Sequence, residues 1–399
     1  MTNEEFIQKN READVRTLAL KPMPDGVDSV WCLRQIEGYQ LAKKKLPRWA
    51  SAEGMWFPPR ISMEQCSSES TATYKAKVAE SLSCKDSFLD MTGGFGVDFS
   101  YMAPLFKKAT YVERQDILCE TARHNFPLLG LGNVEIVNAL SGGDFSLSTN
   151  HYSLIFLDPA RRDDIGRKVF AIEDCTPDIT LLQDELLNNA DYVMVKLSPM
   201  LDITMALRTL HGVSEVHVVS VQGECKELLF IMNRNADTAS TRIHCVNLDT
   251  ADKDFTCILK DIATTHVDFS MPEVGDCLFE PNASIMKAGV QDTFALHYGL
   301  KKLHQHSNLF IKNICETDTG VVTSVPSRIF RITNILDFSK QSLKLLQRTV
   351  GQANIAIRNF PSTVAELRKR LKLKDGGNVY IFATTLCDGS HVLLLCEKY

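Results

Sequence analysis

The stretch Asp90-Met91-Thr92-Gly93-Gly94-Phe95-Gly96 decides the fold class of this chain. It follows a short apolar run, Phe88-Leu89, and precedes a helix-like segment over residues 98–105. Glycines at such a place let the backbone turn sharply and approach a ligand without obstruction by a Cβ atom. The start of the following helix offers free N–H groups. This order of strand, glycine loop and helix predicts a parallel α/β sheet with a ligand site at the loop.

The surrounding sequence repeats the same alternation. Between Ser87 and Met232, short apolar runs alternate with amphipathic segments of helical length, as a parallel α/β sheet requires. The predicted strands are 88–90, 110–113, 134–137, 154–157, 192–195, 216–219 and 228–231. Only a short turn around Gln222-Gly223 joins the last two, so we expect an antiparallel pair, because a parallel crossover needs a dozen or more residues.

Two carboxylates limit the kinds of ligand that the glycine loop can bind. A nicotinamide site would have G-x-G-x-x-G, but Phe99 stands at the third glycine position, and no phosphate-binding G-x-x-x-x-G-K motif is present. Asp90 ends the first strand, and Glu113 ends the second, about 20 residues further on. Glu113 can accept hydrogen bonds from both ribose hydroxyls of an adenosine, and Asp90 can receive a ligand ammonium. The pair indicates a cationic amino-acid nucleoside.

With these residues, the segment from about 75 to 235 resembles the cofactor domain of class I S-adenosylmethionine methyltransferases, whose sheet ends in an antiparallel seventh strand. The resemblance implies a Rossmann-like α/β domain. It also implies S-adenosylmethionine as the cofactor, bound by Asp90, Thr92, Gly93, Gly94, Gly96 and Glu113. In that family an acid after the third strand often contacts the adenine amino group. Asp144 is the candidate here, with an ordinary turn residue as the alternative.

The acceptor side of the site follows the fourth strand, in Asp158-Pro159-Ala160-Arg161-Arg162. Ligands bind outside the carboxyl ends of strands in open α/β sheets, so this segment is expected to face the transferred methyl group. It resembles the D/N-P-P-Y/F motif of the amino-methyltransferases, with Ala160-Arg161 in place of the last two residues. We expect Asp158, with Pro159, to hold the acceptor, while Arg161 either grips an acceptor phosphate or carboxylate or is a solvated loop residue.

Lys196 ends the fifth predicted strand, where a buried lysine needs a partner, and Asp158 is the expected one. The two segments also resemble the RNA uracil-C5 methyltransferases. There a cysteine precedes the proline that corresponds to Pro199, but here Leu197 stands in its place. Covalent attack on a pyrimidine needs a thiolate, which argues against that mechanism. Transfer to a neutral nitrogen needs mainly in-line positioning, which Asp158, Lys196 and Arg161 would provide.

The rest of the chain predicts three further domains. Residues 1–75 form a helical region with helices over 4–19 and 29–45, and its three tryptophans, the only ones in the chain, are expected to pack against the next domain. Residues 236–323 form a connector or a small α+β domain, with a ferredoxin-like fold as one option. Residues 324–399 form an α+β unit with strands over 328–332 and 353–358, helices over 340–350 and 363–371, and a hairpin of 379–384 and 391–396.

The last unit is locally basic. Between Ser339 and Asp375 nine lysines and arginines stand against two acids, in a chain with a net charge of −5. Such a concentration indicates phosphate binding, with a solvated helix face as the alternative. Residues 366–373 and 380–384 resemble the THUMP-like C-terminal domains of bacterial methyltransferase-like proteins, and residues 65–71 and 280–289 resemble other parts of the same group. Because THUMP domains capture structured RNA, the resemblance implies an RNA acceptor such as tRNA or rRNA.

Bulk composition sets outer limits on function. The 399 residues are 44% hydrophobic and 23% charged, which is typical of a globular protein of two to four domains. We expect no membrane segment, since no run reaches the roughly 18 apolar residues that a span needs. The twelve cysteines never form a C-x-x-C pair, so we expect a reduced, cytoplasmic protein without a zinc site. A methyltransferase for small molecules or proteins, and a non-catalytic RNA-binding protein, remain alternatives. The sequence does not determine the oligomeric state.

Overall fold

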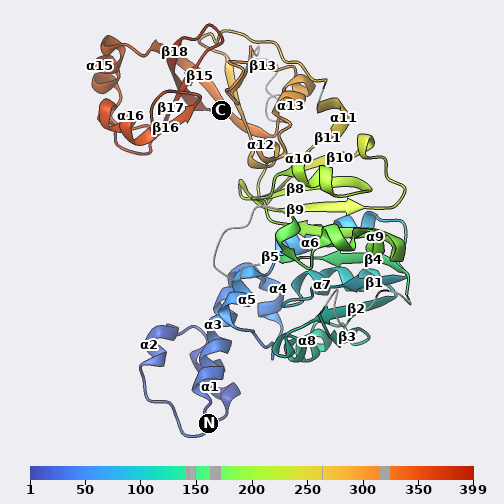
Figure 1. Ribbon diagram of the computed structural model, residues 1–399. Coiled ribbons are helices and arrows are strands. Elements are labelled where there is room, and N and C mark those ends of the chain that lie inside the picture. The colour runs from blue at the N-terminus through green and yellow to red at the C-terminus, as the bar shows by residue number, and fades with distance from the viewer. Residues whose placement is uncertain (141–144, 146, 148–149, 162–171, 263, 314–323) are drawn as a thin grey trace. The chain divides into compact units, whose positions relative to one another are not determined.

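The computed structural model describes every residue except 141–144, 146, 148–149, 162–171, 263 and 314–323 (Figure 1). The described chain groups into two compact units. The first contains Met1–Val216 and Glu227–Thr238, and the second contains His217–Lys226 and Ala239–Tyr399. The division into four domains at residues 75, 235 and 323 stays a prediction. None of the described helices is long and apolar enough to cross a membrane.

A parallel sheet forms the centre of the first unit, and all seven predicted strands are confirmed. They are β1 (Ser87–Asp90), β2 (Lys108–Glu113), β3 (Glu135–Asn138), β4 (Tyr152–Leu157), β7 (Ala190–Leu197), β8 (Val213–Val221) and β9 (Glu224–Met232). Their order is β3-β2-β1-β4-β7-β9-β8. The first five are parallel, and β9 runs antiparallel to β7. The carboxyl ends of β1, β2, β4 and β7 therefore meet at one edge.

The hairpin between β8 and β9 confirms the predicted antiparallel pair. Its turn consists of Gln222 and Gly223, with φ angles of 52° and 80°. Two central residues with positive φ are the mark of a tight two-residue hairpin turn, whose twist matches that of the flanking strands. The tip of this hairpin belongs to the second unit.

Helices lie before and between the strands of the first unit along the chain. They are α6 (Glu69–Ser81), α7 (Val97–Met102, continued by a short 3-10 turn over Ala103–Leu105), α8 (Asp116–Leu128), α9 (Ile179–Asn189) and α10 (Ile203–Thr209). The Ser68 side chain caps α6 by accepting the N–H of Thr71. Four buried rings, Phe88, Phe99, Tyr111 and Phe126, pack against one another between α7, α8 and the sheet.

The N-terminal region is helical, as predicted, but the predicted single helix over 4–19 is wrong. Two helices, α1 (Asn3–Asn10) and α2 (Val15–Ala19), replace it, because Asp14 caps a new helix start by accepting the N–H of Thr17. The predicted helix over 29–45 is confirmed as α3 (Ser29–Lys45). Two short helices follow, α4 (Pro47–Ser51) and α5 (Arg60–Gln65). Trp49 is fully buried, whereas Trp56 is half-exposed and stacks on His124.

The second unit contains a pair of strands, β10 (Arg242–Leu248) and β11 (Phe255–Ile258), and a separate seven-stranded sheet of order β13-β14-β12-β15-β18-β17-β16. The strands of that sheet are β12 (Cys277–Pro281), β13 (Lys301–Lys302), β14 (Phe310–Lys312), β15 (Ser327–Asp337), β16 (Asn354–Arg358), β17 (Val379–Thr385) and β18 (His391–Lys398). The helices of the second unit include α11 (Leu259–Ile262), α12 (Ala283–Ala288), α13 (Gln291–Tyr298), α15 (Lys340–Thr349) and α16 (Val364–Leu371). The predicted strands, helices and hairpin of 324–399 are confirmed. Apolar residues of α15 and α16, among them Leu346 and Leu367, pack in one cluster with β17 and β18.

Candidate functional site

The glycine loop joins the end of β1 to the start of α7. The N–H of Gly93 donates to Val112 O at 2.9 Å, and the N–H of Gly96 donates to Gly93 O at 2.8 Å. A Cβ on Gly93 would lie 2.1 Å from the ring of Tyr111, and Gly96 has a φ of 83°. These two glycines are therefore required by the packing and backbone of the protein itself. A Cβ on Gly94 would meet Thr92 O at 3.7 Å, an ordinary contact, so the φ of 56° rather than packing favours glycine there.

Asp90 is the buried acid at the end of β1. Only 1% of it is exposed, and one carboxylate oxygen accepts the N–H of Thr92 at 2.9 Å. Burial raises the pKa of Asp90 well above its usual value, and the carboxylates of Asp98, Asp158 and Glu113 add to the rise. A cation beside Asp90 would offset that cost, so the site fits the ammonium group of an amino-acid ligand.

Glu113 ends β2 and is buried on the other side of the loop. Its two oxygens accept the N–H groups of Gly94 and Gln115, each at 2.9 Å. A carboxylate oxygen can accept more than one hydrogen bond, so both keep capacity for the hydroxyls of a ribose. The structure thus brings Asp90 and Glu113 to the same edge of the sheet, around one loop, as their spacing predicted.

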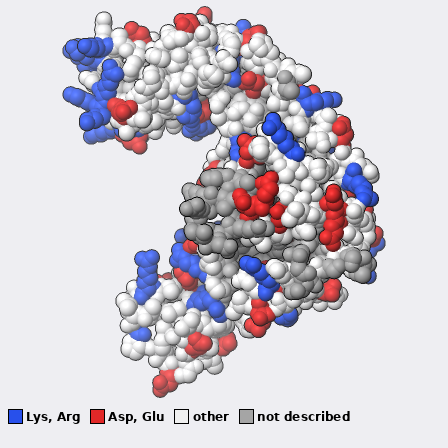
Figure 2. Space-filling model, viewed as in Figure 1, with Lys and Arg blue, Asp and Glu red and all other residues white. Residues whose placement is uncertain are grey.

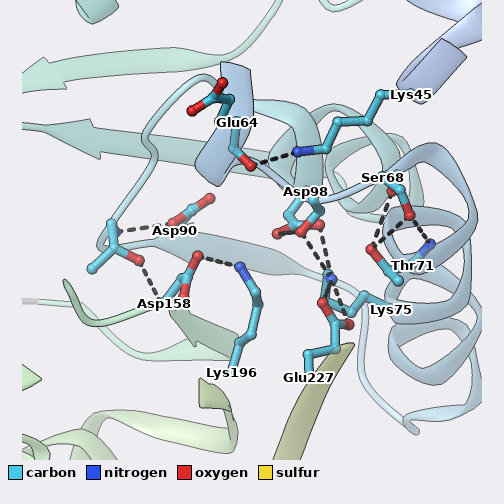
Figure 3. A network of polar contacts seen from close by, with 12 residues as sticks. Lys45, Glu64, Ser68, Thr71, Lys75, Asp90, Asp98, Asp158, Lys196 and Glu227 are labelled. Carbon is cyan, nitrogen blue, oxygen red and sulfur yellow. Dashed lines mark hydrogen bonds and ion pairs between the residues drawn. The ribbon is translucent and has the colours of Figure 1, made fainter. Parts of the chain in front are cut away.

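Thr92 connects the cofactor loop to the acceptor segment. Its N–H donates to Asp90, and its hydroxyl oxygen accepts the N–H of Asp158 at 2.6 Å. Asp158 in turn forms an ion pair with Lys196, the predicted partner (Figure 3). The Asp158 side chain is 38% exposed, whereas that of Lys196 is only 12% exposed. One carboxylate oxygen of Asp158 is taken by the lysine, and the exposure of the side chain leaves room for an acceptor.

Lys196 is held as an ammonium group. Burial by itself would lower the pKa of Lys196, but the carboxylates of Asp158, Asp98 and Glu227 outweigh burial and raise it. Lys196 is therefore a hydrogen-bond donor and a fixed positive charge at neutral pH, and it is unsuited to remove a proton from an acceptor.

The remaining predicted site residues are placed as follows. Pro159 is buried directly after Asp158. Arg161 ends the short strand β5 (Ala160–Arg161), which pairs with β6 (Cys175–Thr176). The side chain of Arg161, and all of Asp144 and Arg162, lie outside the described part of the chain. Leu197 is buried at 3% exposure, where a uracil-C5 enzyme would carry its nucleophile.

Four residues beside this site were not predicted from the sequence: Ser67, Lys75 of α6, Asp98 of α7 and Glu227 of β9. The Lys75 ammonium, fully buried, donates to both oxygens of Glu227 at 2.7 and 2.8 Å and forms an ion pair with Asp98 at 3.2 Å (Figure 3). Ser67 donates to Asp98 at 2.7 Å. Lys75 and Glu227 are 152 positions apart, so no local pattern could have paired them.

The charges of the site favour a cationic ligand. The acids described above are Asp90, Asp98, Glu113, Asp158 and Glu227, and the cations described with them are the ammonium groups of Lys75 and Lys196. An excess of buried carboxylates repels phosphates and stabilises a positive charge. S-adenosylmethionine, with its sulfonium and ammonium groups, fits this excess, whereas a nicotinamide dinucleotide or ATP does not.

The nine basic residues of the segment 339–375 in the second unit lie on α15, β16 and α16 and directly after α16. The structure separates them into two groups. Arg358 shares the buried carboxylate of Glu280 with Arg328, and Arg368 pairs with Asp375 at 2.6 Å. The others are exposed, and together we call them the basic helix face (Figure 2): Lys340, Lys344, Arg348, Lys369, Arg370, Lys372 and Lys374. The two ion-paired arginines are already neutralised by acids of the chain, whereas the seven exposed residues can contact a polyanion.

The expectation that the chain lacks a zinc site stays a prediction. Sequence spacing offered only His304 and His306 as a close pair, but the fold brings other histidines together. His217 of β8 and His244 of β10 stack their rings with centroids 4.4 Å apart. They are 27 positions apart, a spacing in which no zinc motif is apparent.

Comparisons with known proteins find two families that match parts of the second unit and a solved structure that matches nearly the whole chain. The family described as THUMP domain-like matches residues 327–398, and a family described as a ferredoxin-like domain matches residues 278–318. No curated protein sequence matches the chain. The crystal structure of a "putative methyltransferase" from Porphyromonas gingivalis W83 is similar over 99% of this chain and 97% of that one, with 34% identity and a TM-score of 0.85.

Two other solved structures are similar to part of the chain. The ribosomal protein L11 methylase of Lactobacillus delbrueckii subsp. bulgaricus is 12% identical over 41% of this chain and 78% of that one, with a TM-score of 0.31. An rRNA methylase of Streptococcus thermophilus is 14% identical over 41% of this chain and 94% of that one, with a TM-score of 0.30.

The match to the P. gingivalis protein extends over 99% of the chain, and the THUMP-like and ferredoxin-like families match residues 327–398 and 278–318 within it. S-adenosylmethionine is the cofactor indicated by this fold and by the acids around its glycine loop. The chain therefore belongs to the family of the P. gingivalis methyltransferase-like protein, which joins a class I S-adenosylmethionine-dependent methyltransferase fold to a C-terminal THUMP-like domain.

Proposed function

We propose that this protein transfers a methyl group from S-adenosylmethionine to a nitrogen of an RNA base, in tRNA or rRNA. The observation that carries the proposal is the Asp158–Lys196 pair, which lies one hydrogen bond from the cofactor loop through Thr92. It offers a carboxylate oxygen and an ammonium group next to each other. Such a pair is complementary to a base edge that carries an amino or imino N–H beside a ring nitrogen or carbonyl oxygen.

The cofactor residues act by orientation. Asp90 binds the ammonium group of the ligand, and Glu113 binds the ribose hydroxyls. S-adenosylmethionine supplies an activated methyl group when bound between them. Asp144 is proposed to contact the adenine amino group.

The acceptor residues hold the nucleophile in line with that methyl group. Asp158 accepts a hydrogen bond from the N–H of the acceptor nitrogen, whose lone pair then points at the methyl carbon. Lys196 donates to the neighbouring acceptor atom of the base while it stays paired with Asp158. Arg161 is proposed to bind a phosphate of the RNA. Because Lys196 is already protonated, the proton of the methylated nitrogen passes to Asp158 or to water.

RNA is the proposed acceptor because of the second unit. Its THUMP-like region carries the basic helix face, seven exposed cations within 35 residues of sequence (Lys340 to Lys374), in a chain that is acidic overall. Neutralised phosphates release counterions, so such a face favours a polyanion. The cytoplasm, where tRNA and rRNA are modified, is the proposed location.

The experiment is a transfer assay with the full-length protein, S-adenosylmethionine labelled in its methyl group, and total RNA from a strain that lacks the gene. The expected result is label in RNA, recovered after digestion as one N-methylated nucleoside. Asp158→Asn should reduce incorporation by at least tenfold, whereas Asp191→Asn, an exposed acid on β7, should not. If protein or small molecules took up label and RNA did not, the proposal that RNA is the acceptor would be refuted.

A further inference from the structure

A second group of buried charges lies beside the acceptor pair and has no role in the scheme above. We call Ser67, Lys75, Asp98 and Glu227 the Lys75 cluster. Lys75 is 0% exposed, and the side chains of Glu227 and Asp98 are 4% and 10% exposed. Its contacts are the pairs Lys75–Glu227 and Lys75–Asp98, with Ser67 bonded to both Lys75 and Asp98. Burying ions is costly unless they are paired, so the cluster needs an explanation.

The cluster is not balanced within itself. Two carboxyl groups, those of Asp98 and Glu227, share the single ammonium group of Lys75. Lys196 carries a second ammonium group, on which Asp98 and Glu227 act after Asp158.

Strand register explains why Lys196 and Glu227 act on each other. In the antiparallel pair of β7 and β9, Lys196 lies opposite Leu229. Glu227 is two residues from Leu229 on the same strand, so its side chain projects from the same face of the sheet as that of Lys196. Residues in this diagonal relation are close enough for long side chains to meet. Asp98, at the start of α7, reaches the same group of charges through Lys75 (Figure 3).

We propose that Asp98 and Glu227, themselves fixed by Lys75, are positioning residues that hold the Lys196 ammonium group on Asp158. The charges would then alternate from Lys75, through Asp98 and Glu227, to Lys196 and finally Asp158. The role in catalysis rests on the proposed function, because it assumes that Asp158 and Lys196 contact the acceptor. The positioning itself does not rest on it, since it concerns only this chain's own side chains.

The charged and titratable groups that face Lys196 support this role. They are Asp158 after β4, Asp98 on α7, Glu227 on β9 and the half-buried thiol of Cys66 before α6, while Lys75 on α6 pairs with Asp98 and Glu227. Three of them are carboxylates, and together they raise the pKa of Lys196 against its burial. Neutralising Asp98 or Glu227 would remove one of the carboxylates that raise the pKa of Lys196 against its burial, so that pKa would fall.

The test measures the reactivity of Lys196 directly. The full-length protein is treated with trace isotope-labelled acetic anhydride between pH 7 and 10, and the labelling of each lysine is quantified by mass spectrometry. Only the neutral amine reacts, and one unit of pKa changes the neutral fraction about tenfold. Glu227→Gln should increase labelling of Lys196 relative to the exposed Lys44 by about tenfold or more. The matched control is Glu224→Gln, an exposed glutamate on the same strand, which should leave it unchanged.

A second variant and a second readout keep the proposal falsifiable. If Glu227→Gln fails to fold, Asp98→Asn tests the same charge from another element. If Lys196 were labelled to the same extent in every folded cluster variant as in Glu224→Gln, the proposal would be refuted. In the transfer assay, the rate should fall at alkaline pH as Lys196 loses its proton, and Glu227→Gln should shift that fall to lower pH. A general packing defect would instead lower the rate equally at all pH values. Increased labelling in a protein that methylates no RNA would support the positioning role and refute only the proposed acceptor.

Discussion

Replacing Glu113 by glutamine tests how the structure holds the ribose of its cofactor. Glu113 is 7% exposed, and its two oxygens accept the N–H groups of Gly94 and Gln115. Glutamine has nearly the same size but replaces one oxygen with an NH₂ group, which cannot accept. It can therefore satisfy only one of the two backbone donors, and it has lost the negative charge that the ribose hydroxyls would bond to.

The expected magnitude follows from these bonds. A hydrogen bond to a charged group contributes about 1.5–3 kcal/mol, so loss of one to the ribose should weaken binding roughly 10- to 150-fold. The assay is isothermal titration of folded Glu113→Gln protein with S-adenosylmethionine and, separately, with methylthioadenosine, which keeps the ribose but lacks the amino-acid group. Both ligands should lose affinity to a similar extent. Glu120→Gln, an exposed change on α8, is the control and should bind both ligands like the unaltered protein.

The two ligands separate the roles of the two acids. If Glu113→Gln stayed folded and bound both ligands within about twofold of the unaltered protein, the assignment of Glu113 to the ribose would be refuted. If only the affinity for S-adenosylmethionine fell, and that for methylthioadenosine did not change, Glu113 would be assigned to the amino-acid end of the ligand.

Further predictions concern the loop, its buried acid and the basic helix face. Asp90→Asn should weaken the binding of S-adenosylmethionine but leave the binding of methylthioadenosine unchanged. In the unaltered protein, S-adenosylmethionine affinity should fall as pH falls through the raised pKa of Asp90, and a calorimetric pH series showing no such fall would contradict the assignment. Because a raised carboxyl pKa means that the folded state holds its proton more tightly than the unfolded state, ligand-free stability should decline as pH rises through that pKa. Asp90→Asn should therefore raise the melting temperature of the ligand-free protein at pH 8, and a lowered one would argue against burial as the cause. Gly93→Ala should destabilise the protein, since its Cβ would lie 2.1 Å from the Tyr111 ring, and Tyr111→Leu should recover part of that loss in a thermal melt. The triple change of Lys344, Lys369 and Lys372 to glutamine should lower the slope of log affinity for RNA against log salt by roughly 2–3. The same change at the exposed Lys21, Lys44 and Lys77 should leave it unaltered, and equal slopes for both triples would rule out the basic helix face as the RNA contact.

Most of the fold could be predicted from local sequence. The strands from β1 to β9 that build the first sheet are short apolar runs bounded by turn residues, and the turn at Gln222-Gly223 is too short for anything but a hairpin. The error at residues 4–19 came from the same local reasoning. A continuous helical pattern concealed a second start at Asp14, which became visible only through the hydrogen bond of its side chain to Thr17.

The sequence by itself determined the class of cofactor site, because Asp90, the glycines and Glu113 are tied to consecutive strand ends of a parallel sheet. Their proximity follows from connectivity alone. Only the tertiary structure decided how the acceptor side is held. The partners Lys75 and Glu227 come from α6 and β9, and no periodicity relates them. Buried charges find partners through space, and an ion pair requires only that the folded chain bring the groups within a few ångströms. For that reason the network behind Lys196 could be identified only from the structure.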